Sequence, residues 1–87
     1  LTSSYRDDDP RMERVLAWIH RAFTGPMTVA EGARRLCVAP SSFSRAFQRR
    51  IGRPFTVYVN DVRVAEACLL LRHSSRPIAE ISRRCGF

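Results

Sequence analysis

Apolar side chains along this chain recur at intervals of three and four residues, the spacing that places them on one face of an α-helix. Residues 1–9, LTSSYRDDD, are polar and lack this pattern, so we expect a linker or flexible N-terminal edge. The pattern then predicts a core helix that begins at Pro10, with Asp9 as its N-cap, and ends at Gly25 and Pro26. Its apolar stripe consists of Met12, Val15, Leu16, Ile19 and Phe23.

Three further helices are predicted after this one. Thr28 and Glu31 form a T-x-x-E capping box that opens a short helix. Pro40 and Gly52 are suited to the start and end of a helix over residues 40–51, and residues 55–73 predict one long helix. The inward positions of the short helix are Val29, Ala33 and Leu36. The apolar positions of the long helix include Phe55, Tyr58, Val59, Val62, Ala65 and Leu69. No segment has the alternation of a strand, and the fold class is therefore all-α.

Ten residues occur twice, 49 positions apart: VAEGARRLCV at 29–38 and IAEISRRCGF at 78–87. The copies share four identical pairs, namely Ala30 and Ala79, Glu31 and Glu80, Arg34 and Arg83, and Arg35 and Arg84. Each copy has a small residue, a turn residue four positions later and a large apolar residue next to it, which in the first copy are Ala33, Cys37 and Val38. Two helices that cross at a steep angle through a tight turn need this arrangement, so each copy predicts a helix-turn-helix. The second copy stops at Phe87, before its second helix.

The helix at residues 40–51 has two contrasting faces. Phe43, Ala46 and Phe47 form an inward face. The other side is a continuous polar stripe of Ser41, Ser44, Arg45, Gln48 and Arg49. Such a helix fits the DNA major groove, where Arg can bond guanine and Ser or Gln can bond several base edges. The competing interpretation is an ordinary solvated helix face.

The charge of the chain favours a polyanionic partner. The formal net charge is +7, and all fifteen basic residues are Arg. Residues 1–27 hold four Arg and four acids, whereas residues 28–87 hold eleven Arg and four acids. Arg pairs well with phosphate, so a local excess indicates nucleic acid. Codon usage in a GC-rich genome would explain the missing Lys but not the net charge.

Taken together, these segments resemble the DNA-binding module of the AraC/XylS-type bacterial transcription regulators. The segments that carry the resemblance are SSFSRAFQRRIG at 41–52, a linker-helix pattern and IAEISRRCGF at 78–87. The linker pattern consists of Tyr58, Arg63, Ala67, Leu70 and Leu71. The resemblance implies two homeodomain-like helix-turn-helix units joined by a long helix. Residues 10–53 would be the first unit, 54–73 the linker helix and 74–87 the start of an incomplete second unit.

The resemblance also implies site residues and partners. Base readout would fall to Ser41, Ser44 and Arg45, and backbone contacts to Thr28, Ser42, Gln48, Arg49 and Arg53. Arg63 would be largely structural. The implied partner is double-stranded DNA, with RNA polymerase as a further candidate, in the bacterial cytoplasm at the nucleoid. We expect an effector or dimerisation domain before this segment and about 25–35 further residues after it, judging by the repeat and the resemblance.

Two positions depart from the family pattern. Ala39 stands where a capping Ser is usual, which removes about 1 kcal/mol of helix capping unless Ser41 or water substitutes. Cys37 stands where Gly is usual in the turn, so a left-handed conformation there carries strain.

Other functional classes have weaker support. An interaction module could dock the basic helices on an acidic protein surface, and competition by duplex DNA would separate this alternative from DNA binding. An enzyme is disfavoured because His20 and His73 lie far apart and Cys37 has no evident base. Cys37, Cys68 and Cys85 show neither disulfide nor zinc spacing, so we expect free thiols and no metal or cofactor. No segment has the length of a membrane span or the pattern of a signal peptide.

Overall fold

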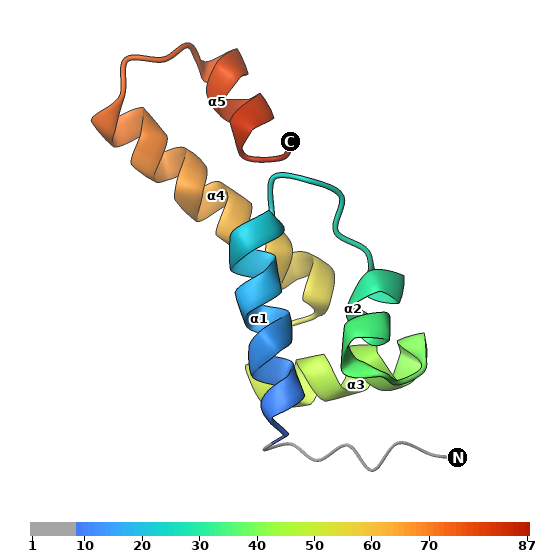
Figure 1. Ribbon diagram of the computed structural model, residues 1–87. Helices are drawn as coiled ribbons and strands as arrows, with labels where there is room; N and C mark the ends of the chain where they lie inside the picture. Colours follow the sequence, from blue (N-terminus) through green and yellow to red (C-terminus); the bar gives the residue numbers. More distant parts are fainter. Residues whose placement is uncertain (1–8) are drawn as a thin grey trace.

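The computed structural model describes residues 9–87, and every regular element in that range is a helix (Figure 1). The helices are α1 (Pro10–Ala22), α2 (Val29–Leu36), α3 (Pro40–Ile51), α4 (Phe55–His73) and α5 (Ile78–Arg84). The all-α prediction is confirmed, and α1, α3 and α4 begin where the sequence pattern predicts, whereas α1 ends at Ala22, before the predicted Gly25 and Pro26. The predicted flexible edge at 1–9 lies outside the described residues except for Asp9.

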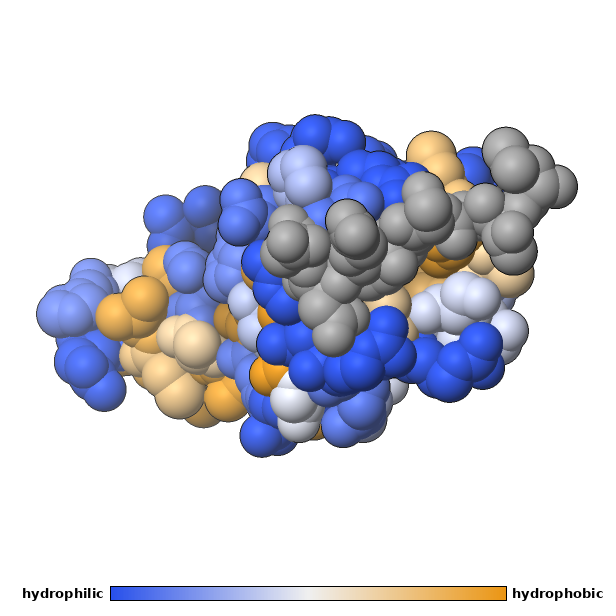
Figure 2. Space-filling view, turned by 90° about the horizontal axis from the view of Figure 1, so that it is seen from below, coloured by the Kyte–Doolittle hydropathy of each residue, from blue (hydrophilic) through white to orange (hydrophobic). Residues whose placement is uncertain are grey.

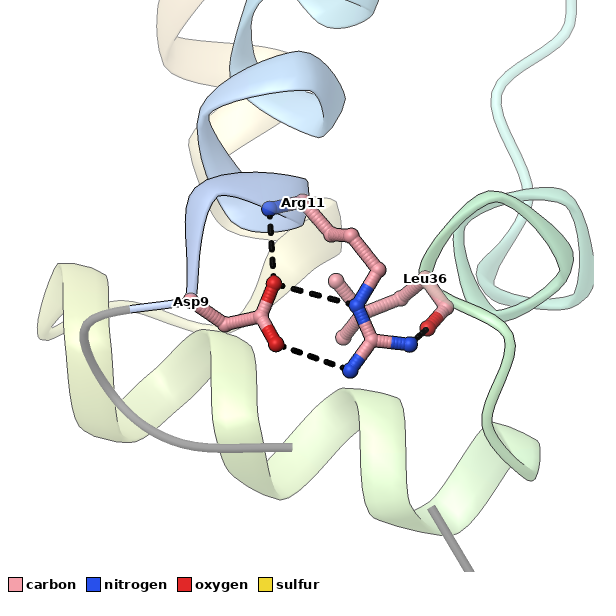
Figure 3. Close-up of polar contacts among 3 residues, drawn as sticks. All are labelled: Asp9, Arg11 and Leu36. Atoms are coloured by element: carbon pink, nitrogen blue, oxygen red, sulfur yellow. Dashed lines mark hydrogen bonds and ion pairs between the residues drawn. The ribbon is translucent and has the colours of Figure 1, made fainter. Parts of the chain in front are cut away.

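Helix α1 begins where the sequence predicts and is tied to the end of α2. Asp9 is the N-cap, and its carboxylate accepts hydrogen bonds from the backbone N–H and the guanidinium of Arg11. The same guanidinium donates to the carbonyl of Leu36 at 2.9 Å (Figure 3). These bonds lower the pKa of Asp9 to about 2. Since the folded state favours the ionised carboxyl, its contribution to stability is present at neutral pH and is lost as the pH falls towards 2.

A tight turn joins α2 to α3. Thr28 caps α2 by accepting from the N–H of Glu31, whose carboxylate pairs with Arg34 and Arg35. Cys37 ends the helix in the left-handed conformation, with φ 62°. The N–H groups of Cys37 and Val38 bond back to carbonyls in the last turns of α2. The left-handed turn expected at Cys37 is confirmed.

The core lies where α1, α2, α3 and the first half of α4 meet. Its centre is aromatic: Phe55 packs edge-on against Phe43 and Phe47, with ring centroids 5.3 and 5.5 Å apart, and stacks on Trp18. Aliphatic side chains from α1 and α2 surround this cluster, and all are buried: Met12, Val15, Ile19, Ala33 and Leu36. The predicted stripes of α1 and α2 therefore face inward, with Leu16 and Val29 only partly covered. Phe23, the last residue of the predicted α1 stripe, instead follows the helix as its C-cap and is half-buried.

Helix α4 leaves this core halfway along its length (Figure 1). Phe55 and Val59 are buried and Tyr58 and Val62 partly buried, but Ala65 and Leu69 are exposed. These last two positions stay exposed because the second half of α4 extends past the first unit. Figure 2 shows apolar atoms gathering at the end of the molecule formed by this half of α4. Exposed apolar residues in this half of α4 include Leu69 and Leu71, whose exposed fractions are 48% and 52%.

Helix α5 folds back along α4 and brings the chain end to the α1–α2 loop (Figure 1). Ile81 and Cys85 are buried, whereas Ile78 and Phe87 are exposed. Gly86 has φ 90°, and a Cβ on it would lie 2.7 Å from the carbonyl oxygen of Phe23. Of the large apolar residues Ile78, Ile81 and Phe87 in the second copy, only Ile81 is therefore covered. The three cysteines are free, as predicted.

Candidate nucleic-acid interface

Helix α3 presents the five polar residues of the predicted stripe together on its outer side. Ser41, Ser44, Arg45, Gln48 and Arg49 are all exposed. On the opposite side, Phe43 and Phe47 are fully buried and Ala46 is 3% exposed. We call the five exposed residues the recognition stripe. They lie on one regular helix that turns its apolar side entirely into the core.

The core holds this helix rigidly against α2. Gly32 is buried in α2, and a Cβ at that position would lie 2.5 Å from a ring carbon of Phe43. The two helices therefore approach as closely as glycine allows. Ala33, which the sequence pattern predicts as the small residue of this crossing, is buried, but the closest contact is at Gly32. A rigid support is what base readout requires, because small displacements would break directional hydrogen bonds.

The first turn of α3 is suited to a phosphate group. Ala39 is the N-cap and supplies no side-chain hydrogen bond, and Pro40 follows at the first helical position. The N–H groups at the start of a helix carry partial positive charge and bind anions readily. The missing side-chain cap that the sequence predicts therefore leaves the start of α3 accessible to an anion.

The remaining predicted backbone contacts lie outside the recognition stripe. Thr28 is exposed at the start of α2, where its hydroxyl oxygen already accepts one bond and its hydroxyl hydrogen can still donate. Ser42 is half-buried on the flank of α3. Arg53 follows α3 and pairs with Asp61 at 2.7 Å, so binding a phosphate there would compete with an existing ion pair.

Arg45 differs from its arginine neighbours in the structure. Within residues 9–87 it has no acidic partner, whereas Arg50 reaches Glu13 at 3.5 Å and so joins the end of α3 to the start of α1. An exposed guanidinium of this kind can pair with a base or a phosphate without first breaking an ion pair.

Arg63 lies far from the recognition stripe and holds the fold together. Its guanidinium donates to the carbonyls of Phe23 and Gly25, both at 2.8 Å, at the point where α1 ends. The structural role expected for Arg63 is thereby confirmed. Helix α4 is fastened in this way to the α1–α2 loop, against which Gly86 also packs.

The described residues form no metal-binding group. No three His, Cys, Asp or Glu side chains among residues 9–87 are placed to hold a metal ion. His20 is hydrogen-bonded to the Tyr58 hydroxyl at 2.8 Å. None of the helices in this part of the chain is both long and apolar enough to cross a membrane.

Comparison with known proteins agrees with this geometry. Residues 32–87 match a family model described as a helix-turn-helix domain. The chain is 30% identical over its whole length to the HTH-type transcriptional activator RhaS of Klebsiella pneumoniae, of which it covers 31%. It is 31% identical over 88% of its length to the HTH-type transcriptional regulator YdeC of Bacillus subtilis, of which it covers 26%. The chain thus spans about a third or less of the curated relatives it matches.

Two solved structures share the fold. The C-terminal domain of AraT, a response regulator from Geobacillus stearothermophilus, superposes with a TM-score of 0.84 and 29% identity. This match covers 91% of the present chain and 66% of the other. A protein of unknown function from Listeria innocua superposes with a TM-score of 0.81 at 24% identity, over 91% of this chain and 75% of that one.

Proposed function

This chain belongs to the AraC-type helix-turn-helix family of transcription regulators, and from that premise we propose that it binds double-stranded DNA sequence-specifically with α3 in the major groove. The observation that carries the proposal is the recognition stripe, which is exposed along one side of a helix whose other side is buried. The family supplies the context of bacterial transcription regulation. The structure supplies a helix of suitable shape and chemistry.

Within this proposal the residues have two kinds of role. Ser41, Ser44 and Arg45, in the first half of α3, read base edges. The remaining residues contact phosphate groups and set the position of the helix: Thr28, Ser42, Gln48, Arg49 and Arg53. This division follows the general geometry of the motif, in which the N-terminal part of the recognition helix enters the groove most deeply.

The linker helix fits a protein that reads along one side of the duplex. Its 19 residues span about 28 Å at 1.5 Å per residue, close to the ~34 Å between successive major-groove faces. The 87-residue chain contains one complete helix-turn-helix unit and the first helix and turn of another. We therefore assign one groove contact to this chain, through α3.

The longer relatives suggest further parts of the whole protein. The matched relatives are about three times as long as this chain or longer. The proposal therefore includes an effector or dimerisation domain on the N-terminal side and contact with RNA polymerase. The place of action would be the bacterial cytoplasm, at the nucleoid.

Selection from a randomised duplex library tests the proposed function directly. The 87-residue chain should enrich one short motif, and its affinity for that motif should fall steeply with salt, with a log–log slope of several units. Fluorescence anisotropy with the selected duplex and a scrambled duplex measures both quantities. No enriched motif, together with a slope near zero, would overturn the proposal.

A further inference from the structure

A second cationic feature lies on the first unit, apart from the recognition stripe. A hollow of about 370 Å³ opens between α1 and the end of α2. Arg14, Ala17 and Arg21 line it from α1, and Arg35 lines it from the last turn of α2. Three arginine side chains surround the small side chain of Ala17, and together they form a surface that can bind an anion. We call this surface the arginine groove.

The positive charge of the arginine groove is only partly balanced. Within the described residues no carboxylate lies within ion-pair distance of Arg14 or Arg21. Glu31 lies 3.5 Å from Arg35 but also pairs with Arg34, so one carboxylate serves two guanidinium groups. The groove therefore keeps an excess of positive charge that an anionic partner can neutralise.

Arg35 forms one wall of the groove, and its side chain is already held in place without a partner. The Arg35 guanidinium lies 4.5 Å from the ring centroid of Trp18, which is itself 4% exposed. A cation over an indole face is held by electrostatic attraction, and the Arg35 side chain still keeps 42% of its surface exposed. Because it is already ordered, it loses little freedom when it binds an anion.

The spacing of the arginines suits carboxylates carried on a protein segment. Arg14 and Arg21 are seven residues apart on α1, about 10 Å along the axis. Acidic side chains seven residues apart on a helix have a similar separation and lie on one face of that helix. Each guanidinium can hold a carboxylate through two parallel hydrogen bonds, and Ala17 leaves room between them.

The position of the groove argues against a second DNA contact. The recognition stripe is exposed on the side of α3 opposite its buried residues. Side chains of α1 pack in the core with that buried side. A duplex seated on the stripe therefore lies across α3 from the arginine groove. From these observations we propose that the arginine groove is a docking site for an acidic segment of a partner protein, separate from the DNA-binding surface.

An oligoglutamate peptide serves as the probe for this proposal. It would be titrated into the isotope-labelled 87-residue chain at low salt, with the Trp18 indole and arginine Nε–H signals followed by NMR. The test variant combines Arg14→Gln and Arg21→Gln, and the control combines Arg72→Gln and Arg83→Gln, which removes equal charge elsewhere. Circular dichroism verifies that both variants keep their helices.

The expected result is a loss of peptide affinity of about tenfold in the groove variant and little change in the control. Signals of Trp18 and Arg35 should move in the unmodified chain. Equal losses in both variants would mean general attraction between charges, and the proposal would fail.

A second measurement, with duplex DNA, distinguishes docking of a protein from contact with DNA phosphates. Affinity for the selected duplex, and its salt slope, should be the same in the groove variant as in the control. A larger loss in the groove variant would make the groove part of the DNA interface and overturn the proposal. The peptide titration uses no DNA, so its result can support or contradict the docking site independently of the DNA binding proposed above.

Discussion

Arg45 and Arg49 lie about one turn apart on the exposed side of α3, yet we expect their substitutions to act differently. Arg45→Ala should cost about 1–3 kcal/mol on the preferred site and flatten the preference at one base pair, because a bidentate pair with guanine would be lost. Arg49→Ala should weaken all sequences by a similar amount. Competition binding against a panel of single-base variants measures both effects. Uniform, sequence-independent losses for both would make Arg45 another phosphate contact.

Substitution of Cys37 should change the stability of the fold rather than DNA recognition. Its left-handed backbone, with φ 62°, is unfavourable for a residue that has a Cβ. Cys37→Gly should raise the free energy of unfolding by about 1 kcal/mol, measured by urea denaturation. Gly52→Ala is the converse control, since Gly52 has φ 86° with open space around it and should lose about as much. A destabilised Cys37→Gly variant would show that the thiol contributes more than the backbone strain costs.

The conformations of single residues were predictable from the sequence where they depend on near neighbours in the chain. The left-handed turn at Cys37 and the caps at Asp9 and Thr28 depend on neighbours a few positions away, and each was predictable. The close contact of Gly32 with Phe43 was not predictable, because it depends on how α2 and α3 cross. The same holds for the bond from Arg11 to the Leu36 carbonyl, which joins residues 25 positions apart.

At the scale of elements, α3 has a defect at its start that substitution can repair. Ala39→Ser should provide the missing side-chain acceptor and add about 1 kcal/mol to the free energy of unfolding. Ala65→Ser is the control, at an exposed position inside α4, where serine should cost about 0.5 kcal/mol. Thermal or urea unfolding compares the two. If both serines lower stability, the start of α3 does not gain from a cap.

In α4 the spacing of apolar residues does not predict which part of the helix is buried. Its apolar residues are spread around the helix, with Val57, Val64 and Leu71 exposed on sides that the predicted stripe omits. The sequence indicates that the segment is helical, but not where the core of the first unit ends along it. That limit is set by the lengths of α1 and α3, which cover only the first half of α4. The exposure of Ala65 and Leu69 follows from this three-dimensional arrangement.

At the scale of the whole molecule, the first unit and α5 meet at one junction. Gly86 packs on the Phe23 carbonyl and on Arg63, and a Cβ there would lie 2.7 and 2.9 Å from them. Gly86→Ala should therefore loosen α5, seen as faster hydrogen exchange at Ile81 and Cys85 with unchanged protection in α1 and α3. Gly25→Ala is the control, since its nearest neighbour would be 3.8 Å away. Unchanged exchange in α5 would show that the junction tolerates the displacement.

The burial of Trp18 has a practical consequence for following these motions. It is the only tryptophan in the chain, and it stacks on Phe55 in the core of the first unit. Its fluorescence emission therefore reports melting of that core, whereas far-UV ellipticity sums over all five helices. Helix α5 is seven residues long and buries only Ile81 within it, so we expect it to melt first. During a urea titration the ellipticity should begin to fall before the emission changes. The interval between the two signals would then separate melting of α5 from melting of the core of the first unit.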